Sequence, residues 1–200
     1  GRQAAVMSGK VDYAAPIAPE TVAFLNNLPD VEVATFRATA ALVVDAPGGG
    51  AEARAAIRWL QGAIPRPGLI DRALLGHGEI GDDTARLPLE AGRAASGTEG
   101  EAPGPLALAP ANADGFARAL ASMAAPLGLG LAIGATPEAA LRARVVAVEA
   151  LAASVDWEAE VFLPAWANGL AAHAARLRHG PLADGAPNDA GRLIERWWFS

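Results

Sequence analysis

The 200-residue sequence contains no cysteine. This absence excludes a disulfide framework, a zinc site built from thiolates and a cysteine nucleophile. It is equally compatible with a periplasmic, an exported and a cytosolic protein. Cysteine usage therefore narrows the chemistry but leaves the compartment open.

Positive charge and long apolar runs are also scarce. Lys10 is the only lysine, and the net charge is −6 without a cluster of arginines. Nonspecific nucleic-acid binding requires clustered positive charge and is therefore excluded. No apolar run approaches the roughly 20 residues that cross a bilayer, and no signal-peptide core follows residues 1–3. Either the protein is not exported or its leader lies outside this sequence.

What the chain does have is enough apolar content, 52% of residues, to bury a core. The length suits one domain, 1–200, interrupted by a Gly- and Pro-rich loop or insert at 91–105. Apolar periodicity alternates between the strand and helix patterns, which predicts an α/β fold with a mixed, largely parallel sheet flanked by helices. The expected strands are 11–13, 31–36, 40–44, 106–108, 129–133 and 160–163. The expected helices are 20–25, 51–64, 68–75, 116–127 and 170–177, a helix that starts at Thr136 and has its apolar face over 141–155, and a last helix capped at Asn188 or Asp189 that carries residues 193–198.

The most informative segment is 71–83, which reads DRALLGHGEIGDD. Gly76 is expected to end the preceding helix in a left-handed conformation. His77, Asp82 and Asp83 would then share one tight loop. That loop is open to three interpretations: a metal or general-base site, part of a ligand cleft, or a structural turn whose aspartates are solvated.

Other candidate sites are weaker. The glycines at 48–50 lie between a strand and a helix, but neither GxGxxG nor GK[ST] is present, which favours a plain loop over a phosphate cradle. No G-x-S-x-G elbow supports a serine hydrolase. His173 and His179 are too far apart in sequence to share one helix face. Trp166 is a candidate cleft platform, with core packing as the alternative.

Three blocks, in this order, resemble the extracellular solute-binding proteins of family 5, the peptide- and nickel-binding components of ABC importers. The first is 5–13 with the Pro-Glu-Thr and Leu-Pro-Asp-Val-Glu-Val that follow it. The second is 53–58 through 69–78, which ends in Leu-Leu-Gly-His-Gly. The third is 162–169, a strand bearing a tryptophan, with Ala-Pro-Asn-Asp at 186–189.

The resemblance implies one lobe of a periplasmic-binding-protein type II fold, without cofactor or bound metal. A peptide-like or small polar ligand would lie in a cleft between lobes, and an ABC permease in the membrane would be the partner. It further implies a monomer in the periplasm or outside the cell. The ligand-binding candidates are His77, Asp82, Asp83, Trp166 and Asn168.

One departure bears on ligand chemistry. Many peptide binders of the family place an aspartate just after the strand with the tryptophan, where it holds the ligand's amino group. This sequence has Asn168 in that neighbourhood. An amide accepts a hydrogen bond from an ammonium group but does not neutralise it, so affinity for a free α-amine is in question.

The sequence thus leaves three hypotheses. The first is a non-enzymatic solute-binding lobe of an ABC importer. The second is a small α/β metal-dependent hydrolase that uses His77, Asp82 and Asp83. The third is a truncated lobe without activity.

Overall fold

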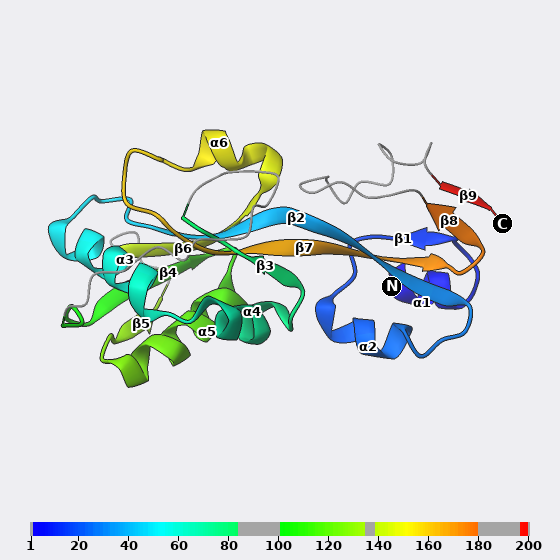
Figure 1. The fold of residues 1–200 in the computed structure, drawn as a ribbon, viewed down its shortest axis with the longest axis horizontal. Coiled ribbons are helices and arrows are strands. Elements are labelled where there is room, and N and C mark those ends of the chain that lie inside the picture. The colour runs from blue at the N-terminus through cyan, green and yellow to red at the C-terminus, as the bar shows by residue number, and fades with distance from the viewer. Residues whose placement is uncertain (1, 84–100, 135–138, 180–196, 200) are drawn as a thin grey trace.

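Two long antiparallel strands run through the whole molecule. The computed structural model describes residues 2–83, 101–134, 139–179 and 197–199. In it, β2 (Val31–Asp45) pairs with β7 (Phe162–Ala174) over most of their length. Figure 1 shows this ladder joining a larger body, built on strands β4 to β6, to a smaller body at the chain's N-terminal end. The sheet order is β1-β7-β2-β6-β4-β5, and β3 (Gly78–Ile80) also pairs with β7.

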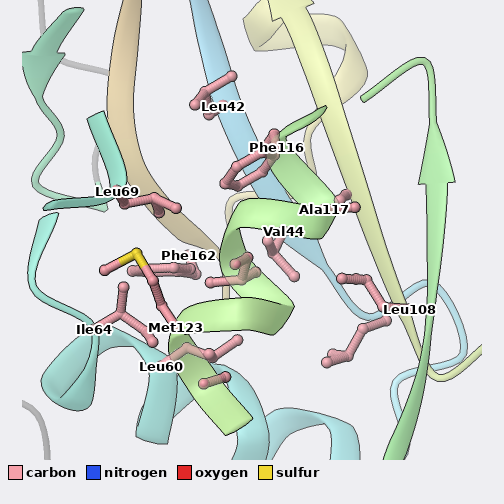
Figure 2. Packing of buried hydrophobic residues seen from close by; sticks show 14 of the residues in the cluster. Leu42, Val44, Leu60, Ile64, Leu69, Leu108, Phe116, Ala117, Met123 and Phe162 are labelled. Carbon is pink, nitrogen blue, oxygen red and sulfur yellow. The ribbon is translucent and has the colours of Figure 1, made fainter. Parts of the chain in front are cut away.

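The larger body is a mixed sheet with helices packed against one face. Strand β4 (Leu106–Ala111) pairs in parallel with β5 (Leu131–Ile133) and β6 (Leu141–Ala147). The helices are α3 (Ala51–Ala63), α4 (Arg66–Leu74) and α5 (Asp114–Ala124). Buried side chains from these helices meet alternate residues of the strands, as Figure 2 shows; they include Leu42, Val44, Leu60, Leu69, Leu108, Phe116, Met123 and Phe162.

The opposite face of the ladder has its own apolar cluster. Because successive side chains of a strand point to opposite faces, Ala41 and Val43 face away from the core that contains Leu42. They pack with Trp166 and with the short segment η3 (Val148–Ala150) and α6 (Leu151–Ser154). The ladder is therefore covered on both faces within the larger body, which explains its continuous apolar runs.

The smaller body packs short elements against the other end of the ladder. These are α1 (Arg2–Met7), β1 (Tyr13–Ala14), η1 (Pro19–Thr21) and α2 (Val22–Leu25). Their core joins Val6, Ile17 and Leu25 to Leu170 of β7. Strands β8 (Leu177–His179) and β9 (Trp197–Phe199) form a separate antiparallel pair. Among the described residues, no helix combines the length and the apolar character that a membrane crossing requires.

The mixed α/β class is confirmed, but the sheet is not largely parallel. Within the described residues, parallel pairing is confined to β4 with β5 and with β6, and the other ladders are antiparallel. The strands expected at 31–36 and 40–44 are one strand, β2, interrupted by an irregularity opposite β7. Strand 106–108 and the helices expected from 51, 68 and 116 are confirmed within a few residues.

Three expected helices are wrong over residues that the structure describes, although residues 151–154 of the first do form the short helix α6. Residues 141–147 form β6, and residues 162–174 form one strand, β7, which includes most of the segment expected to be helical from Leu170. Each segment has a strand on both sides. Strand β6 lies between β2 and β4, and β7 lies between β1 and β2. Because of this pairing, tertiary structure overrides the helix propensity of the alanines. Trp197 and Trp198 lie in strand β9, whereas residues 193–196 and the helix start expected at Thr136 lie outside the described residues.

Candidate functional site

The Gly-His-Gly segment turns the chain from α4 into β3. Helix α4 ends at Leu74, and both Leu75 and Gly76 adopt left-handed conformations, with φ of 51° and 81°. The expected role of Gly76 is confirmed, with Leu75 sharing the conformation. His77 N–H donates to the Leu74 carbonyl oxygen at 2.9 Å and closes the turn. The segment thereby places β3 alongside β7.

Two further glycines let β3 and the residues after it approach β7 closely. A Cβ on Gly78 would lie 2.6 Å from Leu74 Cδ1 and 2.8 Å from the Trp166 carbonyl oxygen. A Cβ on Gly81 would lie 2.1 Å from the Leu163 carbonyl oxygen. No side chain fits at these distances. The glycines of this segment therefore have a packing reason that is independent of any ligand.

Asp83 is bound within the protein. Its Oδ2 pairs with Arg66 Nη2 at 2.6 Å, and its Oδ1 accepts the Leu163 N–H at 2.7 Å. Arg66 is 4% exposed, also donates to the carbonyl oxygens of Gly81 and Leu163, and lies 5.4 Å from the centre of the Phe162 ring. Burial raises the pKa of Asp83, against the opposing effect of Arg66. Asp83 therefore anchors the segment after β3 to β7.

The metal-site interpretation of this loop loses its support. With Asp83 committed to Arg66 and Leu163, the remaining candidates are His77 and Asp82, both half-buried. Within the described ranges, no group of three or more histidine and acidic side chains is placed to hold a metal ion. A two-residue set is too small for the three protein ligands that a catalytic zinc site uses.

Trp166 lies in the core of the sheet. It is 1% exposed and packs in the cluster that contains Ala38, Val43 and Leu163. Core packing was the alternative to a cleft platform in the sequence analysis, and it is the position that the structure gives to this side chain.

Asn168 supports an irregular point in the β2–β7 ladder. The pairing register shifts between Phe36 and Ala40, and Ala38, fully buried within that shift, has a left-handed φ of 52°. The Ala38 N–H, which the shift removes from the ladder, donates to Asn168 Oδ1 at 3.0 Å. Asn168 N–H donates in turn to the His77 carbonyl oxygen at 3.1 Å. The Asn168 side chain thus joins β2 to β7, and its backbone N–H joins β7 to the Gly-His-Gly turn.

A charged pair that sequence reasoning did not select lies beside this amide. Glu79 Oε1 accepts from Arg37 Nε at 3.0 Å and from Asn168 Nδ2 at 3.4 Å. The hydrogen bond from Arg37 is the largest cause that lowers the pKa of Glu79, with burial opposing it. Arg37 and Glu79 are 42 residues apart, and no spacing rule connects them, since their meeting depends on β3 adding to β7.

We define the mid-ladder window as Thr39, Ala40, Ala167, Asn168 and Gly169. These residues are partly exposed, whereas the neighbouring runs of β7, 161–166 and 170–173, are buried. The window lies at the end of the larger body, where Ala40 pairs with Ala147 of β6 and Ala167 pairs with Gly78 of β3. Its residues are small apart from Asn168, and Arg37, His77 and Glu79 border it. The window is therefore a partly exposed stretch of the ladder that carries the polar side chains of Thr39 and Asn168.

Replacing Asn168 with alanine is expected to lower the free energy of unfolding by about 1–3 kcal/mol, because the buried Ala38 N–H loses its acceptor. Asn27→Ala is the matched control, because its side chain makes one exposed bond to Ala23 in the same helical turn and should change stability by less than about 0.5 kcal/mol. Urea unfolding of both variants measures the difference. Equal costs would show that Asn168 does not support the bulge.

Glu79→Gln is expected to lower stability at pH 7 by less than about 1 kcal/mol, since the pair is partly exposed. The folded-state pKa of Glu79 is lowered, so its contribution is present above the unfolded pKa and is lost as pH falls through the folded value. The difference between wild type and variant should therefore shrink between neutral pH and about pH 3. Urea titrations at several pH values check this, and a difference that grows in acid would contradict it.

No protein-family model and no curated protein matches the sequence. Solved structures match its fold. An ABC transporter substrate-binding protein from Sinorhizobium meliloti has a TM-score of 0.66 at 14% identity, with 100% of this chain and 59% of that chain covered. The agropinic acid complex of AgaA from A. tumefaciens has a TM-score of 0.64 at 13% identity, covering 100% and 58%. A dipeptide-binding protein from Pseudoalteromonas, in complex with Met-Leu, has a TM-score of 0.62 at 10% identity, covering 100% and 56%.

The chain therefore spans less than two thirds of the length of these proteins. At such low identities the likeness shows the fold, which is that of one part of an ABC transporter substrate-binding protein. The structural neighbours are binding proteins, as the resemblance in the sequence implied.

Proposed function

We propose that this chain is the lobe of an ABC importer's substrate-binding protein that supplies one wall of an inter-lobe cleft. Two observations together support the proposal: the fold shared with substrate-binding proteins, and the presence of the mid-ladder window in this chain. The fold match extends over the whole chain, and the window, which contains Asn168 and is bordered by His77, is a partly exposed stretch of the ladder. Ligand pockets occur preferentially at the interfaces between domains.

The ligand we propose is a peptide-like or small polar solute, contacted by His77 and Asn168 with Asp82 at the edge. Asp83 and Trp166 serve this wall indirectly, by fixing the segment after β3 and the core beneath it. A permease in the membrane is the proposed partner of the intact, monomeric protein, in the periplasm or outside the cell. The metal-dependent hydrolase is disfavoured, because Asp83 is already bound by Arg66.

The test is ligand-dependent stabilisation of the intact protein. Because a ligand that binds only the folded state raises stability by about 2.7 kcal/mol at one hundred times its Kd, a thermal-shift screen against dipeptides, tripeptides and opines should give a clear rise in Tm with one class. His77→Ala should reduce that shift. Turnover of a screened compound that His77→Ala abolishes, without any stabilisation, would favour the enzyme instead.

A further inference from the structure

We propose that a hollow among the helices of the larger body binds a carboxylic acid with an apolar chain, and that Arg72 receives its carboxylate. The hollow has a volume of about 710 Å³, within the roughly 300–1,000 Å³ of small-molecule sites. It lies where the end of α3, the start of α4 and the end of α5 meet. The inference concerns a second site and does not depend on the proposed function.

The hollow is separate from the mid-ladder window. Pro65 and Pro67, at the start of α4, line the hollow. Leu74, at the end of the same helix, lies against Gly78, whose strand partner Ala167 belongs to the window. Among the described residues that line the hollow, none belongs to the window. The two sites are therefore distinct.

Most of the lining is apolar. Ile64 and Met123, which belong to the buried core drawn in Figure 2, form its floor. Ile80 and Leu127, at its rim, are 42% and 47% exposed. These large apolar side chains border one hollow, so a ligand with an apolar body would remove both from water.

Prolines hold the walls of the hollow. Pro65, Pro67 and Pro126 line it, and the proline ring fixes φ. A Cβ on Gly68 would lie 3.4 Å from Met123 Cε, so α4 and α5 are already in close contact beneath the hollow. The site is therefore formed before a ligand arrives, which keeps the entropic cost of binding low.

Arg72 supplies the uncompensated charge of the lining. Its Nη1 donates to the neutral Ser122 Oγ at 3.2 Å. Arg66, which also lines the hollow, is neutralised by Asp83. The described lining contains no acidic residue. A ligand with one negative charge therefore complements this surface.

The lack of a carboxylate partner sets Arg72 apart within the part of the chain that the structure describes. The sequence has 22 acidic and 16 basic residues, so acidic partners are not scarce. The other arginines whose side chains are described all pair with a carboxylate: Arg37, Arg54, Arg58, Arg66, Arg118, Arg142, Arg144, Arg176 and Arg178. The exception is the arginine that borders an apolar hollow.

The guanidinium of Arg72 has donors left for a ligand. It carries five N–H groups in a planar fork that matches a carboxylate, and Ser122 engages one nitrogen. A bound carboxylate would add charge-assisted hydrogen bonds at Arg72, and its hydrocarbon chain would cover Ile80 and Leu127. A fatty acid has this combination of one charge and one apolar chain.

Isothermal titration calorimetry of the intact protein with hexanoate, octanoate and decanoate tests the proposal, with 1-octanol as the uncharged analogue. The variants are Arg72→Gln, Arg72→Lys and Leu127→Ser. Arg118→Gln is the matched control, because Arg118 is an exposed arginine of α5 that does not line the hollow. Circular dichroism and ligand-free Tm establish that each variant is folded.

We expect wild type and Arg118→Gln to bind the acids with an affinity that rises about three- to fourfold per methylene, as burial of each CH₂ implies. Arg72→Gln should weaken octanoate binding about fivefold or more and leave octanol binding unchanged, whereas Arg72→Lys should retain part of the preference for octanoate. Leu127→Ser should weaken the binding of both. Undiminished octanoate binding by Arg72→Gln, affinity independent of chain length, or no binding of any acid would overturn the inference and leave the proposed function untouched.

Discussion

Replacing Arg66 with methionine is expected to lower the free energy of unfolding by about 3–5 kcal/mol, the cost of leaving one partner of a buried ion pair alone. Arg66 and Asp83 have side chains that are 4% and 9% exposed, so solvent would screen an unpaired charge at this position only weakly. Arg66 also donates to the carbonyl oxygens of Gly81 and Leu163. The substitution would thus release the segment after β3 from β7.

The loss should depend on pH. Burial already raises the pKa of Asp83, and removing Arg66 is expected to raise it further. An acid whose pKa is higher in the folded state binds more protons there than in the unfolded state. The variant therefore loses stability as pH rises from the unfolded pKa to the folded pKa. The deficit of Arg66→Met is therefore largest near neutral pH and smaller in acid. Urea unfolding across pH 4–8 measures it.

Two controls separate this effect from loss of packing. Arg58→Met removes the partly exposed pair with Glu160 and should cost less than about 1 kcal/mol. Arg66→Met combined with Asp83→Asn should recover part of the loss, because no unpaired charge remains. If Arg66→Met costs no more than Arg58→Met, the pair does not anchor this segment.

Replacing Gly81 with alanine is expected to cost about 3 kcal/mol, at the upper end of the usual range for overpacking. The new Cβ would lie 2.1 Å from the Leu163 carbonyl oxygen and 2.9 Å from the Ala165 backbone nitrogen, and backbone atoms cannot rotate away as a side chain does. Strand β7 or the segment after β3 must therefore shift. Guanidinium unfolding of the variant gives the cost.

Gly48→Ala is the matched substitution at an open position. A Cβ there meets nothing within 4 Å, and the residue has no left-handed φ. Because alanine reduces the freedom of the unfolded chain, the variant should equal wild type or gain up to about 1 kcal/mol. A Gly81→Ala protein as stable as Gly48→Ala would show that β3 does not approach β7 as closely as described.

The sequence predicted elements well where one local rule governs them. Apolar spacing located α3 and α5, and the left-handed requirement located the turn at Gly76. It failed where long-range pairing competes with local propensity. The stripe from Leu141 to Val155 fits a helix by spacing, but β2 and β4 lie on either side of residues 141–147 and hold them extended.

The candidate site divides in the same way. His77 and Asn168 stand out by motif and position; Asn168 belongs to the window and His77 borders it. Arg37 and Glu79 carry no motif, and they meet because β3 pairs with β7. Asp83 looked like a loop carboxylate because its partner Arg66 lies 17 residues earlier, inside what reads as an ordinary helix start. The role of each carboxylate depends on its burial, and burial depends on the tertiary fold and cannot be predicted from the local sequence.

The pairing of β2 with β7 also shapes how the protein is made. Thr39 bonds to a residue 128 positions later in the chain, so during synthesis β2 is complete long before its partner exists. Its apolar residues and unpaired backbone groups are then open to association with other chains. Contacts this distant in sequence also slow folding, since a large loop must close before they form. We therefore expect the nascent chain to depend on chaperones until β7 has been synthesised.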